Sequence, residues 1–174
     1  MLQSHRMPRA PVSSSLKLPP FQQLLDAHGR DVHRFLVATV GHGAADDCYQ
    51  ETWLAALRAY PRLRDGSNLR SWILTVAHHK AIDHIRAGRR AAVPVGEVPE
   101  RPAPPADVVF TEDGDSELWG FVRDLPNKQR MAVALRFVAD AGYSEISAAM
   151  GTSEEAARRN VHEGLKRLRM EYQR

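Results

Sequence analysis

The sequence predicts an all-α protein made of two small helical domains joined by a flexible linker. Three observations carry this prediction. Apolar residues recur at helical spacing on both sides of the middle of the chain, and no stretch shows the alternation typical of a strand. The middle itself is acidic and rich in proline, without apolar periodicity. A hydrophobic fraction of 43% is ordinary for a globular chain, so a packed core is expected.

The domain boundaries follow changes in composition. Residues 1–20 are basic and contain serine and proline, so we expect a disordered tail. Residues 21–90 and 117–174 are the two expected helical domains, and residues 91–116 are the expected linker. The linker has one basic residue, Arg101. Its acidic residues are Glu97, Glu100, Asp107, Glu112, Asp113 and Asp115.

Helical periodicity is clear along the first domain. One helix is predicted from Phe21 to Val40, and the Gly-His-Gly sequence after it ends that helix. Asp46 or Asp47 can cap the next helix, which we expect to run to Tyr60, before a proline. After a polar loop, a long helix follows over residues 69–90. Its predicted inward-facing residues are Leu69, Trp72, Ile73, Val76, Ile82 and Ile85.

Four further helices are predicted in the second domain, over residues 117–123, 126–139, 144–150 and 152–169. Pro126 suits the first turn of its helix. Thr152 and Glu155 have the spacing of a capping box, which would start the last helix sharply after a glycine. The predicted buried stripe of that helix is Ala157, Val161, Leu165 and Leu168.

Charge and cysteine content narrow the classes of function. The net charge is +3 and the pI about 9.3, and most of the acidity sits in the linker. The folded parts are therefore cationic, which favours nucleic acid as a partner. The single cysteine, Cys48, excludes an internal disulfide, and the simple interpretation is a reducing cytoplasm. We expect no membrane partner, because no run of about 18 apolar residues exists.

The last two predicted helices have the pattern of a helix-turn-helix, in which the second helix lies in the major groove of DNA. Its exposed face offers candidate DNA-binding residues, which are Arg158, Arg159, His162 and Lys166. Arginine can bind guanine through two hydrogen bonds at once, so this face could read base edges. The alternative is that any short helical hairpin with a glycine turn has the same pattern.

The long helix of the first domain is a second candidate surface for DNA. Its basic residues, suited to phosphates, are Arg70, Lys80, Arg86, Arg89 and Arg90. Trp72 either stacks on an exposed base or packs in the core, and its place on the apolar stripe favours the core. His78 and His79 diverge by about 100° on a helix, which argues against a metal site. No cofactor or metal is therefore expected, and these histidines are expected to face solvent or phosphate.

Together these blocks resemble the extracytoplasmic-function class of bacterial RNA polymerase sigma factors, from about Phe21 to Arg169. The segment DDCYQETWLAALRAY is similar to the second conserved region of that class, with its Asp-x-x-x-Gln-Glu-x-aromatic pattern. The segment NLRSWILTVAHHKAIDHIR shares its tryptophan, Val-Ala pair and Asp-x-x-Arg ending. In the second domain, LPNKQRMAVALRF resembles the opening of the fourth region, and YSEISAAMGTSEEAARRNVHEGLKRLR its helix-turn-helix. The four motifs occur in the right order across a linker.

The resemblance implies a non-enzymatic subunit that binds core RNA polymerase and promoter DNA. It implies that one surface of this chain docks on the clamp coiled coil of the β′ subunit of polymerase. The residues implied for this surface are Asp47, Gln50, Glu51 and Trp53. The β flap of polymerase is a second implied contact. The loop with Arg62, Arg64 and Asn68 would capture a base of the −10 element. The helix-turn-helix would read the −35 duplex, and an anti-sigma factor is a further implied partner.

Some residues depart from the family pattern, and other functions compete. His79 stands where the family has asparagine, and Glu154 and Glu155 would repel phosphate. One alternative is a mimic that binds an anti-sigma factor without binding DNA. Others are a helix-turn-helix repressor and a helical metal hydrolase. A separate hypothesis is that the two domains fold together in the free protein and mask their DNA-binding surfaces.

Overall fold

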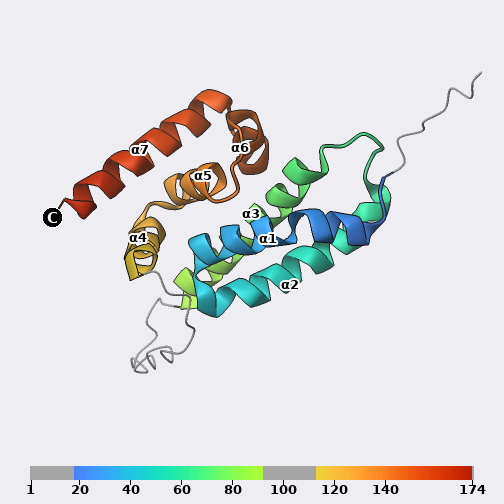
Figure 1. Cartoon of the computed structure of the whole chain (residues 1–174), viewed down its shortest axis with the longest axis horizontal. Coiled ribbons are helices and arrows are strands. Elements are labelled where there is room, and N and C mark those ends of the chain that lie inside the picture. Colours follow the sequence, from blue (N-terminus) through green and yellow to red (C-terminus); the bar gives the residue numbers. More distant parts are fainter. Residues whose placement is uncertain (1–17, 92–112, 174) are drawn as a thin grey trace, which may run out of the picture.

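The computed structural model describes residues 18–91 and 113–173, all of it helices and connecting turns (Figure 1). The prediction of an all-α fold is confirmed. No described helix is long and apolar enough to cross a bilayer. The helices are α1 (Phe21–Val40), α2 (His42–Ala59), the 3-10 turn η1 (Tyr60–Arg62), α3 (Leu69–Ala91), α4 (Asp113–Asp124), α5 (Asn127–Phe137), α6 (Tyr143–Met150) and α7 (Glu154–Tyr172).

Helices α1, α2 and α3 pack against one another as the first unit (Figure 1). An aromatic cluster closes one end of this unit, where the Phe21 ring lies 5.9 Å from Trp53 and 5.2 Å from Tyr60 between ring centroids. The Tyr60 hydroxyl donates a hydrogen bond of 2.5 Å to the carbonyl of Pro19. Leu18 and Pro19 of the expected tail thus contact the unit, whereas residues 1–17 lie outside the described part.

Helix α2 begins earlier than predicted. Gly41 has φ +84°, a conformation favourable for glycine, and its N–H donates to the carbonyl of Val37. The chain reverses at this one residue, so α2 starts at His42. Asp46 and Asp47 consequently lie inside the helix, exposed, and the prediction that one of them caps it is wrong.

The buried face of α3 is shifted from the predicted stripe. Leu74, Ala77 and Ala81 are buried together with Ile73, which was predicted. The other predicted inward residues are only partly buried. The physical reason is that α3 contacts α1 and α2 on one side and α6 of the second unit on another, so its buried face is wider than an isolated three-helix bundle requires.

Helix α4 starts at Asp113, inside the segment predicted to be the linker. The rest of that linker, residues 92–112, falls outside the described residues, and its flexibility stays a prediction. Pro126 precedes α5 with an extended ψ of 141°, as the N-cap and not in the first turn as predicted. The side chain of Leu125, in the turn between α4 and α5, is buried and so holds this turn in place.

The start of α7 is capped by Ser153, whose hydroxyl accepts a hydrogen bond of 3.1 Å from the N–H of Ala156. The predicted capping box of Thr152 and Glu155 is therefore wrong by one residue. Gly164 is buried where α7 crosses α5, and a Cβ there would lie 2.7 Å from Cγ2 of Val133. Glycine costs helix stability, but here it allows the two helices to approach closely.

The two helical units do not stand apart. One cluster of buried apolar side chains runs through both, and α6 packs on α3 while α4 and α5 pack on α1. Arg130 joins the units through its guanidinium, which donates to the carbonyl of Thr39 at 3.2 Å and to that of Leu125 at 3.3 Å. The predicted fold of two helical domains is confirmed, and in this conformation the two pack on one another and share a core.

Candidate nucleic-acid interface

A tight turn aims α7 away from α6. Gly151 has φ +61°, and the N–H groups of Gly151 and Thr152 donate to carbonyls in the last turn of α6. This is how a left-handed residue ends one helix so that the next can start in a new direction. At the other end of α6, a carboxylate oxygen of Glu145 accepts a hydrogen bond of 3.0 Å from the N–H of Gly142. Helix α6 is therefore held at both of its ends by hydrogen bonds.

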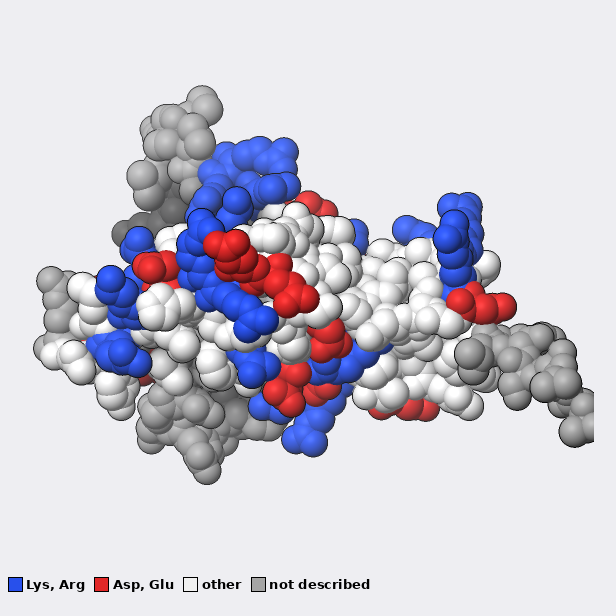
Figure 2. Space-filling model, turned by 90° about the horizontal axis from the view of Figure 1, so that it is seen from above, with Lys and Arg blue, Asp and Glu red and all other residues white. Residues whose placement is uncertain are grey.

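The predicted reading face of α7 is exposed, with Arg158, Arg159, His162 and Lys166 all at the surface. Arg158 pairs with Glu154 at 3.4 Å and Arg159 with Glu155 at 3.5 Å, each one helical turn apart. Exposed pairs of this kind contribute little free energy, so a phosphate or base can replace the carboxylates. Figure 2 shows the same intermixing of cationic and acidic side chains over one face of the molecule.

The loop before α3 presents the predicted base-capturing residues. Arg62 and Arg64 are exposed, and so is Asn68. The Asn68 side chain accepts a hydrogen bond of 3.0 Å from the N–H of Ser71, so it also caps α3. Gly66, at φ +79°, lets the loop turn between these side chains. The structure brings all three predicted residues to one loop.

Arg70 is not free in this conformation. Its Nη1 donates to both carboxylate oxygens of Glu145 at 3.0 Å, and its Nη2 donates to the carbonyl of Ala139. Both side chains of the pair are less than one-third exposed. The predicted phosphate-binding edge of α3 therefore ends at this residue, because α6 covers it.

The remaining cations of α3 differ in their surroundings. Lys80 lies 3.8 Å from Glu51 on α2, which ties it to the neighbouring helix. Arg86, Arg89 and Arg90 are exposed near the end of the helix, and Arg89 donates to the side chain of Asn127 at 3.2 Å. This end of α3 is the part of the predicted cationic edge that is open to solvent.

Trp72 and His78 are part of the packing. The Trp72 ring packs against the core and lies 6.1 Å from the Tyr60 ring, as the core alternative predicted. His78 is only 8% exposed, and burial, then His79 and Arg86, lower its pKa to about 4. It is neutral at pH 7, so the expectation that it faces solvent or phosphate is wrong. His79 and His84 are exposed, and no group of metal-ligating side chains occurs among the described residues.

Helix α2 carries a second exposed surface. Asp47, Gln50 and Glu51 lie on it as predicted, but Trp53 is only 6% exposed, with its ring against Phe21 and Tyr49. Trp53 thus supports this surface from inside and does not form it. Two apolar residues of the same helix, Leu54 and Leu57, are 52% and 51% exposed and were not predicted as part of this surface. Leu54 follows Glu51 by three residues and Gln50 by four, and Leu57 follows Leu54 by three, so helical spacing could have indicated both.

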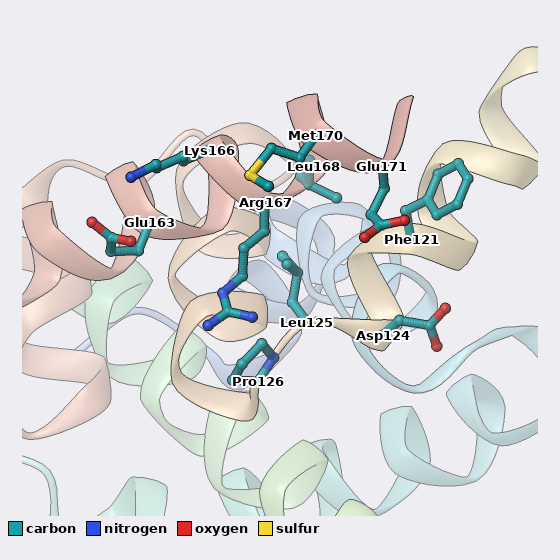
Figure 3. Close-up of a pocket in the computed structure, with 10 residues that line it drawn as sticks. All are labelled: Phe121, Asp124, Leu125, Pro126, Glu163, Lys166, Arg167, Leu168, Met170 and Glu171. Carbon is teal, nitrogen blue, oxygen red and sulfur yellow. The ribbon is translucent and has the colours of Figure 1, made fainter. Parts of the chain in front are cut away.

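A groove of about 640 Å³, which was not predicted, lies between α4 and α7 (Figure 3). Phe121, Leu168 and Met170 supply its apolar walls, while Arg167 reaches down toward Pro126. Charged side chains of both signs line the rest. Its volume is far larger than a single water molecule needs, and its lining combines apolar and charged side chains.

Comparison with known proteins identifies both units. The Sigma-70 region 2 family matches residues 24–91, and the Sigma-70, region 4 family matches residues 116–168. The chain is 32% identical over 154 residues to the RNA polymerase sigma factor CarQ of Myxococcus xanthus, covering 86% of this chain and 87% of CarQ. It is 36% identical over 133 residues to the ECF RNA polymerase sigma factor SigD of Mycobacterium tuberculosis, and spans 63% of the length of that protein.

Two solved structures share the fold. The sigma factor RpoE in complex with the anti-sigma factor NepR from Bartonella quintana superposes with a TM-score of 0.68 at 21% identity, over 86% of this chain and 94% of that one. CnrH in complex with the cytosolic domain of CnrY gives 0.66 at 18% identity, over 88% and 87%. At these identities the likeness concerns the arrangement of the helices.

Proposed function

The chain belongs to the extracytoplasmic-function class of RNA polymerase sigma factors, and from this membership we propose that it binds core polymerase and directs it to promoters. The observation that carries the proposal is the joint presence of an open helix-turn-helix and an exposed acidic and apolar surface on α2. A protein that only binds DNA needs the first and not the second. The chain would act without catalysis of its own, in the cytoplasm with the polymerase.

The DNA contacts divide between the two units. We assign the −35 duplex to α7, whose exposed cations can enter the major groove. We assign the −10 element to the loop before α3, where Arg62, Arg64 and Asn68 lie together. A base taken out of the stack needs a pocket or ring to hold it, and the Trp72 ring is already packed against Tyr60. The loop side chains are therefore the stronger candidates for that contact.

The polymerase contact is assigned to α2. Leu54 and Leu57 form the apolar centre of this surface, with Asp47, Gln50 and Glu51 beside them. An apolar centre with a polar rim is the usual anatomy of a protein interface, and the acidic rim favours a basic partner surface. The clamp coiled coil of β′ is the proposed partner here, with the β flap as a second polymerase contact for the other unit.

The test is capture of purified core polymerase by the full chain, followed by transcription from a library of promoter fragments. Leu54→Asp should weaken capture by about tenfold or more, since it places a charge in the centre of an interface. Ala27→Asp is the control, because it places the same charge at an exposed apolar residue of α1, outside the surface assigned to polymerase. A chain that captures no polymerase contradicts the proposal, and so does one that captures it without selective transcripts.

The alternative of a mimic that never binds DNA gains no support from the surface. Such a protein has no need to keep exposed arginines on α7 and on the loop before α3. A repressor would leave the acidic and apolar surface of α2 without a role. An anti-sigma factor stays a proposed partner, since the sigma factor RpoE, which shares the fold, was solved in complex with the anti-sigma factor NepR.

A further inference from the structure

We propose that Tyr143 is a positioning residue that holds the guanidinium of Arg158 for reading a base, and that Arg159 serves only a phosphate. The inference rests on the proposed function, because it concerns how α7 recognises the −35 duplex. It divides two adjacent arginines that the sequence cannot tell apart.

The first observation is a stacking contact between the two helices. Tyr143 is the first residue of α6, and Arg158 lies in the second turn of α7. The central guanidinium carbon of Arg158 lies 4.4 Å from the centroid of the Tyr143 ring. A cation this close to an aromatic ring is attracted by the electrons of the ring face. The contact restricts a side chain that would otherwise sample many rotamers at an exposed site.

The ring is itself tied to the core. The guanidinium carbon of Arg136 lies 5.2 Å from the centroid of the same ring. Arg136 also donates a hydrogen bond of 3.0 Å to the carbonyl of Ala141, which is fully buried. A row of contacts therefore runs from a buried carbonyl through Arg136 and Tyr143 to Arg158. A ring held in this way can fix the position of the arginine beyond it.

Stacking leaves the hydrogen-bonding edge of Arg158 available. A guanidinium interacts with an aromatic ring above it, while its N–H groups point outward in its own plane. The edge of Arg158 now meets Glu154 at 3.4 Å, which shows that it can bind an acceptor while stacked. The O6 and N7 atoms of guanine present two acceptors to such an edge. Guanine can thus replace Glu154 without any loss of the ring contact.

Arg159 has different surroundings. It points about 100° away from Arg158 around the helix, and its one salt bridge is with Glu155 at 3.5 Å. Its side chain is 68% exposed against 58% for Arg158, and no aromatic ring stacks on it among the described residues. A mobile cation suits a phosphate, which offers charge from many directions, better than it suits the fixed edge of a base.

The experiment selects DNA from a pool of duplexes with a randomised −35 element, using the full chain bound to core polymerase. The wild-type chain should prefer guanine at one position. Tyr143→Leu should reduce that preference by about fivefold or more, whereas Tyr143→Phe, which keeps the ring, should retain it. Tyr172→Leu is the matched control, because Tyr172 is 74% exposed at the end of α7.

A second variant guards against misfolding, because Arg158 is exposed and its replacement leaves the core intact. Arg158→Lys should lose the same base preference, and combining it with Tyr143→Leu should add nothing further. Arg159→Ala should weaken binding to all sequences alike and lower the slope of log affinity against log salt by about one.

The outcomes separate this inference from the proposed function. A wild-type chain that selects no sequence overturns the proposed function and the inference with it. Selection that survives unchanged in Tyr143→Leu overturns the inference alone. Selection lost in Tyr143→Phe also overturns it, since the hydroxyl and not the ring would then be the operative group.

Discussion

His78 shows how the role of a single residue depends on its surroundings. Three histidines lie close together on α3, yet His79 and His84 are exposed while His78 is buried. Its Nδ1 atom has no hydrogen-bond partner among the described residues. Burial without compensation favours the neutral ring, which is why its pKa falls to about 4. A residue that the sequence placed beside solvent or phosphate is therefore a core residue.

This pKa predicts acid sensitivity. The unfolded chain binds a proton at about pH 6.5 and the folded chain only at about pH 4, so unfolding takes up a proton between these values. The free energy of unfolding should fall as the pH drops from 6.5 to 4, by up to about 3 kcal/mol from this group. Urea titrations at pH 7.5 and 5 should show that the free energy of unfolding falls less in His78→Gln than in the wild type. The same fall should remain in His84→Gln, and an equal fall in all three proteins contradicts the prediction.

For individual residues, the sequence predicted which polar side chains of a helix are exposed. The cations of α7 are exposed as the helical periodicity indicated, and so are Asp47, Gln50 and Glu51 on α2. Trp53 was not, because a tryptophan in a docking motif and a tryptophan in a core have the same spacing. Its burial follows from the rings of Phe21 and Tyr49, which come from two different helices.

At the scale of elements, the helix ends are where sequence and structure differ most. The bounds of α1 match the prediction, and α3 starts where expected, while α2, α4, α5, α6 and α7 begin at other residues than expected. Several residues near each start can serve as a cap, and the local sequence does not choose among them. The choice is made by the turn before the helix, such as Gly151 and the two hydrogen bonds that it helps to form.

The cap of α7 gives a direct prediction. Ser153→Ala should lower the free energy of unfolding by about 1 kcal/mol, since it leaves the N–H of Ala156 without its side-chain partner. Thr152→Ala, at the residue that the sequence pattern favoured, should change stability by less than half as much. Thermal melts of the two variants check this, and the reverse order would restore Thr152 as the cap.

The crossing of α5 and α7 gives a second prediction. Gly164→Ala should destabilise the protein by about 1–3 kcal/mol, because the new Cβ meets Cγ2 of buried Val133 at 2.7 Å. Gly88→Ala is the matched control in α3, with nothing within 4 Å of its added Cβ. It should stabilise by up to about 1 kcal/mol through helix propensity. Chemical denaturation measures both, and stabilisation by both substitutions would contradict the close approach.

At the scale of the whole molecule, the closed arrangement of the two units sets what the surfaces can do. Arg70 is a predicted DNA-binding residue, yet it is held by Glu145 and by the carbonyl of Ala139. The same guanidinium cannot serve the carboxylate and a phosphate at once. The hypothesis that the free protein masks part of its DNA surface is supported at this residue, whereas the exposed cations of α7 remain open.

This competition predicts a gain in DNA binding when the ion pair is removed. Glu145→Gln keeps an oxygen for the N–H of Gly142 but loses the charge that holds Arg70. Affinity for promoter DNA should rise several-fold, and small-angle scattering should show a more expanded chain. Glu117→Gln is the control, because it removes an exposed charge of α4. Equal affinities in the two variants would contradict the prediction, as would unchanged affinity after cleavage of the linker.

By itself the sequence determined the all-α class, the order of the two units, the family and the exposed polar residues of α2 and α7. These depend on periodicity and local motifs, which a chain carries without its neighbours. Only the tertiary structure decided that the units share a core, that Arg70 lies under α6, that Trp53 and His78 are buried, and that Tyr143 supports Arg158. Each of these is a contact between residues distant in sequence, and helical spacing shows which face a side chain occupies but not which other element covers it.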